Sequence, residues 1–308
     1  MQFRTLGHSG VQVSVIGLGG NTFGDTVDHA GTSAIVRTAL EVGINFIDTA
    51  ESYSAGRSEE FLGAALEGCR DSVVLGTKTG GRNQPGLEAG GRLTRRTMVA
   101  RLEASLRRLR TDYVDLYYFH FPDPLTPVDE SMRAVEDLIR SGKVRYLACS
   151  NHQAWQVAVM VGIAQRQGTT GPVASQSAYN MLERDVEREM LPACRGLGVS
   201  FVPFAPLARG FLTGKYRRNQ PPAEGTRLAR TAQARESYFT EAHFERLARY
   251  EAFASARSRS VGELALAWLF AHSQVASVIA GATSPDQVRE HARAADWSLS
   301  DDELRELG

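Results

Sequence analysis

Short apolar runs alternate along the chain with longer stretches in which apolar residues recur at helical spacing. Eight of the runs are continuously apolar, which is typical of β-strands covered on both faces. They begin near Val15, Ile44, Val73, Tyr113, Val144, Val173, Val199 and Val275. The helical stretches between them include residues 32–43, 58–68, 95–109, 128–142 and 186–198. The pattern predicts parallel strands joined by crossover helices.

The spacing of these units favours a closed sheet. The first six intervals between strand starts measure 26 to 40 residues, which suits a strand, a helix and two loops. Eight such units predict an α/β fold, a (β/α)₈ TIM barrel, rather than an open doubly wound sheet. A short N-terminal hairpin with its turn at residues 8–10 and long loops at the C-terminal rim are also expected. We expect one domain over residues 1–308.

The last interval between strand starts is longer than the others, at 76 residues. It predicts two helices, within 239–257 and 260–273, after an irregular excursion from Lys215 to about Ser237. Between Lys215 and Arg235 the excursion carries six basic residues against Glu224 alone. A solvated loop and a lid over a bound ligand both fit this charge.

Composition narrows the classes of function. The 308 residues include 35 Lys+Arg and 35 Asp+Glu, so zero net charge gives no long-range attraction to nucleic acid or anionic lipid. No apolar stretch reaches about 18 residues, and no basic residues precede an apolar run at the start, which argues against membrane spanning and secretion. The three cysteines are far apart, so neither a disulfide framework nor a metal site is expected. We expect a cytoplasmic protein without a metal.

Catalytic residues of a parallel barrel gather where its strands end. Three successive predicted strands end in ionisable side chains, in the order Asp48, Lys78 and His120, and Tyr53 follows Asp48 by five residues. A single residue of this kind is usually a cap, a solvated lysine or a core histidine. Three of them on one rim favour an active site.

These four side chains can form a proton donor. A lysine ammonium beside a tyrosine hydroxyl lowers the phenol pKa from about 10, and an aspartate keeps that lysine charged. His120 can donate a hydrogen bond to a substrate oxygen, an interaction worth roughly 3 kcal/mol where negative charge develops. Proton donation to a nascent alkoxide suits carbonyl reduction. Because no side chain supplies a hydride, a nicotinamide cofactor is implied.

Segments along nearly the whole chain resemble, in order, the aldo-keto reductase superfamily. They are FIDTAESYSAGRSEEFLG, VVLGTK, DYVDLYYFHFPD, ACSNH, SQSAYNMLER, PFAPLARGFLTGKY and VIAGATSPDQVREH. The resemblance implies a (β/α)₈ barrel that binds NADPH without a Rossmann domain and reduces aldehydes or ketones to alcohols. It also implies that Tyr53 is the general acid, that Lys78 and Asp48 tune it, and that His120 orients the carbonyl.

The resemblance further implies a set of cofactor contacts around the rim. The contacts at the nicotinamide are Ser150, Asn151, Gln176 and the ring of Phe204, and those along the pyrophosphate are Leu207, Gly210 and Lys215. The contacts at the adenosine end are Gly281, Thr283, Ser284, Gln287 and Glu290. Thr22, in an adjoining rim loop, completes the set. The alternatives are that Ser150 and Asn151 cap the next helix and that Phe204 belongs to the core.

The positions that would recognise the 2′-phosphate depart from the family pattern. Gly281 and Gln287 stand where many NADPH-dependent members carry Lys and Arg, and fewer fixed cations weaken recognition of the 2′-phosphate. Arg209 or Arg289 could compensate, so NADPH is the expected cofactor and NADH the alternative.

The substrate is expected to be a small carbonyl compound. Its contacts are predicted at Phe23, at Phe121 and in the loops after Lys78 and Gly214. An aromatic rim suits aldehydes with apolar or aromatic bodies. The sequence indicates neither a nucleic-acid partner nor a membrane partner, and it does not indicate the oligomeric state.

Two other functions stay open. Some barrels that resemble this one are NADPH-binding regulatory subunits of ion channels, and slow turnover would then make the four residues a redox sensor. A hydrolase with two carboxylates would need a second acid near Asp48, for which Glu51 is the obvious candidate.

Overall fold

The computed structural model describes residues 1–82 and 90–308. Its main sheet has eight parallel strands, in the order β10-β3-β4-β5-β6-β7-β8-β9. They are β3 (Ile16–Gly19), β4 (Phe46–Asp48), β5 (Val74–Thr79), β6 (Val114–Phe119), β7 (Val144–Ser150), β8 (Ala174–Gln176), β9 (Ser200–Phe201) and β10 (Val278–Gly281). Parallel bridges from Phe201 to Val275 and from Phe204 to Ile279 join the two edges of the sheet. The predicted (β/α)₈ barrel and its eight strands are confirmed.

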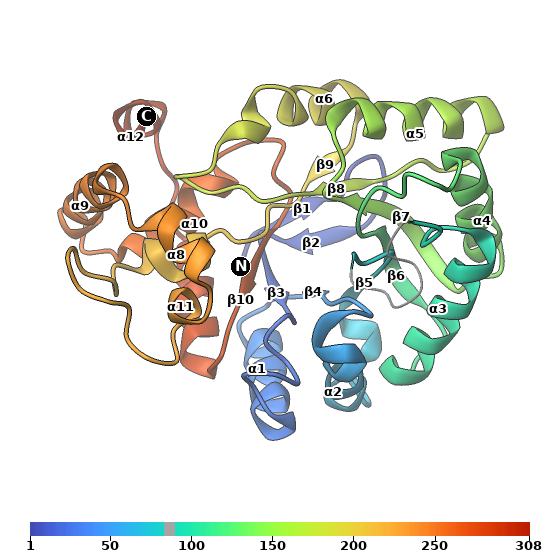
Figure 1. Ribbon diagram of the computed structural model, residues 1–308, viewed down its shortest axis with the longest axis horizontal. Helices are drawn as coiled ribbons and strands as arrows, with labels where there is room; N and C mark the ends of the chain where they lie inside the picture. The colour runs from blue at the N-terminus through green and yellow to red at the C-terminus, as the bar shows by residue number, and fades with distance from the viewer. Residues whose placement is uncertain (83–89) are drawn as a thin grey trace.

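Helices surround the strands (Figure 1). They are α1 (His29–Glu41), α2 (Arg57–Ala65), α3 (Arg95–Leu109), α4 (Val128–Arg140), α5 (Ala154–Gln167), α6 (Met190–Leu197), α7 (Arg227–Arg230), α8 (Ala232–Tyr238), α9 (Glu241–Ser255), α10 (Val261–Phe270), α11 (Pro285–Ala294) and α12 (Asp301–Leu307). Capping sets several boundaries: the Thr94 side chain accepts from Thr97 N at the start of α3, and Ser260 and Glu263 form a capping box at α10. Within the described residues, no helix is long and apolar enough to cross a bilayer.

The excursion after β9 is more regular than predicted, because it contains α7 and α8. Leu228 and Tyr238 are buried among its basic residues, and the ring of Phe211 stacks on that of Tyr238. Arg230 reaches from α7 to Asp25 in the loop after β3, at 3.5 Å. The expected irregular loop is therefore wrong for this part of the chain, since buried apolar side chains hold it against the barrel.

The N-terminal hairpin closes one end of the barrel, as predicted. Its antiparallel strands are β1 (Phe3–Thr5) and β2 (Gln12–Ser14), which cross the centre of the view in Figure 1. Leu6 and Val13 are fully buried and pack with residues of the barrel interior. Gly7 donates its N–H to Ser200 Oγ (2.7 Å) in β9, and a Cβ at Gly7 would meet Val173 O at 2.2 Å. Only glycine fits this contact, which seals the amino-terminal ends of the strands.

Alternate strand residues face the barrel interior, where Phe46, Leu116, Tyr118, Ala148, Ala174, Val202 and Ile279 pack together. The next residues of the same alternation, two positions further on, reach the carboxyl end of the barrel. They are Asp48, His120, Ser150, Gln176, Phe204 and Gly281, and Lys78 follows Gly76 in the same way. The period of two therefore gathers the predicted site residues on the inside of one rim.

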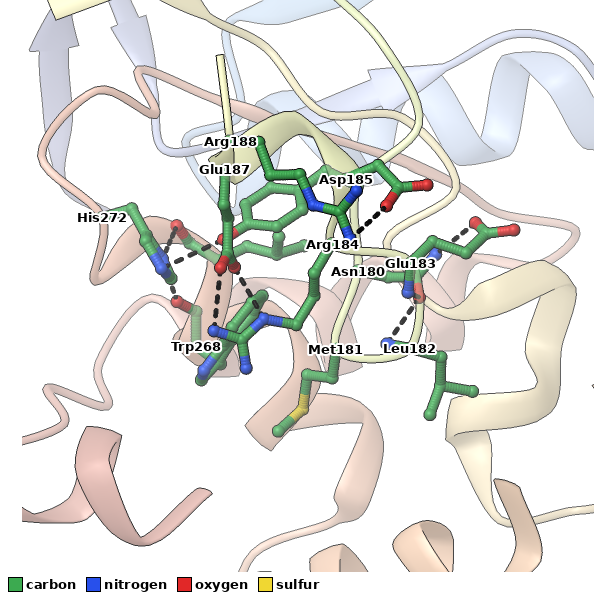
Figure 2. Close-up of polar contacts among 12 residues, drawn as sticks. Asn180, Met181, Leu182, Glu183, Arg184, Asp185, Glu187, Arg188, Trp268 and His272 are labelled. Atoms are coloured by element: carbon green, nitrogen blue, oxygen red, sulfur yellow. Dashed lines mark hydrogen bonds and ion pairs between the residues drawn. The ribbon is translucent and has the colours of Figure 1, made fainter. Parts of the chain in front are cut away.

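A polar network fixes the loop after β8 against α10 (Figure 2). Glu187 accepts hydrogen bonds from Tyr179 Oη (2.7 Å) and from Arg184 Nε and Nη2 (2.7 and 2.9 Å). Tyr179 Oη also lies 3.0 Å from His272 Nε2, and the Tyr179 N–H donates to Phe204 O at 3.3 Å. The network therefore holds the backbone that presents Phe204 at the rim.

Candidate active site

Three of the predicted catalytic side chains form one hydrogen-bonded chain at the carboxyl end of the barrel. Lys78 Nζ pairs with Asp48 Oδ2, donates to Thr49 O at 2.8 Å and lies 3.4 Å from Tyr53 Oη. Asp48 Oδ1 accepts from Gln176 Nε2 at 3.0 Å. Lys78 is 0 % exposed and Asp48 is 2 % exposed. The ammonium therefore sits between a buried carboxylate and a phenol.

A tight turn after β4 returns the tyrosine to the rim. Tyr53 opens the 3₁₀ helix η1 (Tyr53–Gly56), in which Ser54 and Ala55 have positive φ angles of 51° and 56°. Ser54 Oγ donates to Phe23 O at 2.8 Å, which ties this turn to the loop after β3. Positive φ at residues other than glycine is strained and concentrates at functional sites. We interpret the strain as the cost of placing the Tyr53 phenol at the rim.

Burial and charge act against each other at the lysine and the tyrosine. Burial alone would lower the pKa of Lys78, but Asp48 and Tyr53 outweigh it, so the pKa lies above its ordinary value. Burial raises the pKa of Tyr53, whereas Lys78 lowers it, and the net pKa is raised. The expected net lowering is therefore wrong, because exclusion of water disfavours phenolate more than one ammonium favours it. At neutral pH the phenol is protonated and the lysine is charged.

His120 is held as a neutral ring. Burial, with the charge of Lys78 adding to it, lowers the pKa of His120 to about 3. Its backbone is fixed on both sides: the N–H donates to Thr79 O at 2.8 Å, and the carbonyl accepts from Asn151 Nδ2 at 3.0 Å. A neutral imidazole has one N–H to donate and one lone pair to accept.

The aromatic rings of the site pack against one another. Tyr53 and His120 meet edge to face, with centroids 5.9 Å apart, and Phe121 stacks on His120 at 4.8 Å. The guanidinium of Arg82 lies 4.5 Å from the centre of the Phe121 ring. Phe121 is therefore beside the reacting groups, where a substrate contact was predicted.

The predicted nicotinamide contacts come together next to the tetrad, which is Asp48, Tyr53, Lys78 and His120. Asn151 Nδ2 donates to Ser150 Oγ at 3.0 Å, and Gln176 uses its Nε2 on Asp48. Among the described residues, the Ser150 hydroxyl hydrogen, Asn151 Oδ1 and Gln176 Oε1 have no partner, so they present one donor and two acceptors. That set matches a carboxamide. Helix α5 is capped by Gln153, so the alternative role of Ser150 and Asn151 as helix caps is wrong.

Cations gather on the segment after β9. In the 3₁₀ helix η4 (Ala208–Thr213), a Cβ at Gly210 would lie 3.1 Å from Lys215 Nζ, so the lysine rests on bare backbone. Burial and the nearby charge of Arg209 lower the pKa of Arg227, which also lies close enough to Tyr53 to influence its pKa. In the part of the chain that the structure describes, no carboxylate pairs with Arg209, Lys215 or Arg227. Three such cations suit a pyrophosphate.

Arg227 was missed as a site residue by the sequence reasoning, which placed it in an excursion of undecided role. The high density of arginine in that excursion was the available signal. Leu207 precedes η4 and is half-buried.

The residues predicted at the adenosine end lie on β10 and α11. Ser284 caps α11, accepting from Gln287 N at 3.4 Å, and Gln287 Oε1 accepts from Thr283 N at 2.8 Å. Arg289 pairs with Asp286 at 3.0 Å. Glu290 accepts a hydrogen bond from Ser260 Oγ at 3.4 Å. Gly281 is exposed and lies next to Asn21. Thr22 Oγ1 donates a hydrogen bond to Ala282 O at 3.0 Å. Arg289, one of the two arginines that could compensate at this end, is thus already paired.

Two predicted side chains do not reach the mouth. Phe23 is 0 % exposed and packs in the core between barrel and helices, so the substrate contact expected there is wrong. Glu51 Oε1 accepts from Thr79 Oγ1 (3.1 Å) and Gly80 N (3.2 Å), and Thr79 faces away from the interior. Glu51 therefore does not form a carboxylate pair with Asp48. Of the loop expected after Lys78, residues 83–89 lie outside the described residues.

Comparison with known proteins agrees with this geometry. Residues 15–308 match the model described as "Aldo/keto reductase family". The chain is 35% identical over 302 residues to a "Probable voltage-gated potassium channel subunit beta" of Oryza sativa subsp. japonica, covering 96% of this chain and 92% of that protein. It is 36% identical over 296 residues to human "Aldo-keto reductase family 7 member A3" (91% and 88%), and 31% identical over 334 residues to "Versiconal hemiacetal acetate reductase" of Aspergillus parasiticus (100% and 96%). The chain therefore belongs to the aldo/keto reductase family of oxidoreductases.

Proposed function

We propose that this protein reduces aldehydes or ketones to alcohols with NADPH as its hydride donor. The observation that carries the proposal is the buried ammonium of Lys78, which is paired with Asp48 and lies 3.4 Å from Tyr53 Oη. A fixed cation beside a protonated phenol is a device for giving a proton to an oxygen that gains negative charge.

The side chains have separate tasks in the proposed reaction. The carbonyl oxygen lies between Tyr53 and His120, and the neutral imidazole donates a hydrogen bond to it. Tyr53 transfers its phenolic proton to that oxygen, and Lys78 compensates the charge of the phenolate until solvent returns the proton. A reduced nicotinamide, when bound, supplies the hydride to the carbonyl carbon.

The rim offers partners for each part of the cofactor. Ser150, Asn151 and Gln176 would hold the carboxamide, and the half-buried ring of Phe204 would lie against the nicotinamide. The unpaired cations after β9 would meet the pyrophosphate. Of the two arginines that could compensate for Gly281 and Gln287, Arg289 is paired with Asp286, whereas Arg209 pairs with no carboxylate among the described residues, which favours the additional phosphate of NADPH. NADH is the alternative, because Gly281 and Gln287 supply no cation.

A second function has support from one of the relatives. The rice protein that is 35% identical is named as a probable channel subunit. The same buried tetrad, with slow turnover, would then report the redox state of the bound cofactor. Such a role predicts cofactor binding with negligible consumption of it.

One assay separates the two functions. The purified chain is incubated with NADPH, or with NADH, and a panel of reactive aromatic and aliphatic aldehydes, and cofactor oxidation is followed by absorbance. We expect turnover with aromatic aldehydes that is faster with NADPH than with NADH. Tight NADPH binding without oxidation by any aldehyde would contradict the reductase and support the regulatory role. The cytoplasmic location expected from the sequence stays a prediction.

A further inference from the structure

A cavity lies on the outer side of the barrel wall, behind the carboxyl ends of β6 and β7. Its volume is about 240 Å³, and its apolar lining comes from the loop after β6 and the first turns of α4 and α5. Phe119 forms part of this lining, and it faces away from the interior because its neighbours Tyr118 and His120 face inward. The barrel wall therefore separates this cavity from the tetrad.

One buried polar side chain in the lining has an unused hydrogen-bonding atom. His152 is 8 % exposed, and its Nδ1 lies 2.8 Å from Ser150 O. Because a carbonyl oxygen only accepts, Nδ1 carries the proton of the ring. Burial lowers the pKa of His152 to about 4, so the ring is neutral at physiological pH. Its Nε2 thus presents a lone pair, for which the described residues provide no partner.

The carboxylate in the same lining is already saturated. Asp123 Oδ1 accepts from Gly91 N (2.9 Å) and Leu125 N (3.2 Å). Its Oδ2 accepts from Leu93 N (2.8 Å) and Thr126 Oγ1 (2.7 Å). These four bonds hold the loop after β6 in place, so the cavity is preformed. The oxygens of Thr126, Ser131 and Gln156 in the lining also take part in hydrogen bonds, whereas His152 Nε2 has none among the described residues.

The entrance of the cavity is apolar and partly exposed. Trp155 is 63 % exposed and Val159 is 41 % exposed, both on α5, and both belong to the lining. An indole at the edge of a pocket offers a flat surface for an aromatic ring. Apolar cavities of roughly 150 Å³ are known to hold benzene, so the volume suits one ring.

We propose that this cavity binds a small, neutral, single-ring aromatic molecule that donates one hydrogen bond to Nε2 of His152. A bound ring without a donor would cover that lone pair and leave it without a partner, at a cost in affinity. The site is separate from the tetrad, and it does not depend on the function proposed above.

The probes are phenol and anisole, which carries the same oxygen without the hydroxyl hydrogen. Both are titrated against the full chain, and binding is followed by ligand-observed NMR. We expect phenol to bind about tenfold more tightly than anisole, which is the effect of one hydrogen bond. Equal affinities for the two probes, or no binding of phenol, would overturn the proposal.

Variants locate the binding. His152→Phe keeps a ring but removes the acceptor, so we expect phenol and anisole to bind it alike. Trp155→Ala, at an exposed position that does not threaten the fold, should weaken both probes several-fold. Val99→Ala, an exposed apolar residue on α3 outside the lining, and Phe121→Ala, at the tetrad, should leave phenol affinity unchanged. Loss of phenol binding in Phe121→Ala, or an unchanged phenol affinity in both cavity variants, would place the ligand elsewhere and overturn the proposal.

Discussion

The charge of Lys78 depends on one carboxylate. Burial alone would lower its pKa, and the pair with Asp48 is the largest influence that raises it. Asp115 offers a contrast within the same barrel, because it accepts from Arg70 Nη2 (2.7 Å) and Leu75 N (2.9 Å) and has no contact with the tetrad. Asp48 therefore acts on the pKa of Lys78, whereas Asp115 holds neighbouring strands together.

Asp48→Asn is expected to lower kcat by at least about 100-fold, because burial without the counter-ion lowers the pKa of Lys78, and an uncharged lysine no longer stabilises phenolate. The residual rate should fall as pH rises, since Lys78 then loses its proton at a lower pH. The measurement is kcat as a function of pH for Asp48→Asn and for the control variant Asp115→Asn. Asp115→Asn should retain the kcat of the unmodified protein, and an Asp48→Asn profile identical to that of the unmodified protein would refute the tuning role.

The low pKa of His120, about 3, makes a prediction about the pH profile. The ring is neutral both above and below pH 6.5, so its task as a neutral donor is not switched in the physiological range. We expect kcat/KM to show no ionisation of His120 between about pH 5 and 8. A limb near pH 6.5 that disappears in His120→Gln would contradict this assignment.

Single residues differ in how well the sequence predicts them. Asp48, Lys78 and His120 could be predicted because each lies at the end of an apolar run, where the alternation of a strand fixes which way a side chain faces. The location of the Phe23 side chain could not be predicted, because Phe23 lies in a loop. A loop has no regular alternation that would distinguish an aromatic ring in the core from one that contacts substrate. The net pKa of Tyr53 also escaped prediction, since it depends on burial that the sequence does not reveal.

At the scale of elements, the loop after β8 is held by a partly buried charge network. The Arg184 and Glu187 side chains are about 30 % exposed, and Tyr179 is fully buried. Arg188 and Asp185, on the same loop, form a pair 3.9 Å apart whose side chains are 84% and 96% exposed. The two pairs allow a matched comparison within one segment.

Glu187→Gln is expected to lower the free energy of unfolding by about 1 to 3 kcal/mol, because it removes the charge that Arg184 faces and weakens the acceptor of Tyr179. Arg188→Gln, at the exposed pair, should change it by less than about 0.5 kcal/mol. Denaturant unfolding measures both. Equal effects of the two substitutions would show that the network does not stabilise the loop.

Helices α7 and α8 were not predicted from the sequence. These helices have few apolar residues, and arginines lie between them. The stretch with helical spacing of apolar residues is therefore too short to indicate a helix. Tertiary burial of Leu228 and Tyr238 decides the structure there. By contrast, α3 runs over the predicted residues 95–109, because a long apolar period and a threonine cap define it.

For the molecule as a whole, three buried histidines link stability to pH. Burial lowers the pKa of His120 to about 3 and those of His152 and His291 to about 4. The unfolded chain binds protons at these sites near pH 6.5, whereas the folded chain does not. Their contribution is therefore complete above pH 6.5 and is lost as pH falls toward 4.

His291→Leu is expected to flatten this dependence. The loss of unfolding free energy between about pH 7 and 4 should shrink by on the order of 3 kcal/mol, because one uncharged buried imidazole no longer takes up a proton on unfolding. The exposed His8, changed to Asn, is the control and should leave the slope unchanged. Unfolding by denaturant at several pH values tests both, and identical slopes for the two variants would count against the linkage.

Tyr53→Phe tests the central claim most directly, because it removes one oxygen and leaves the ring in place. Single-turnover oxidation of NADPH with nitrobenzaldehyde is compared with NADPH affinity for the variant and the unmodified protein. The account predicts a rate at least about 100-fold lower with a nearly unchanged Kd. Turnover retained by Tyr53→Phe would contradict it, since the proton would then come from another group.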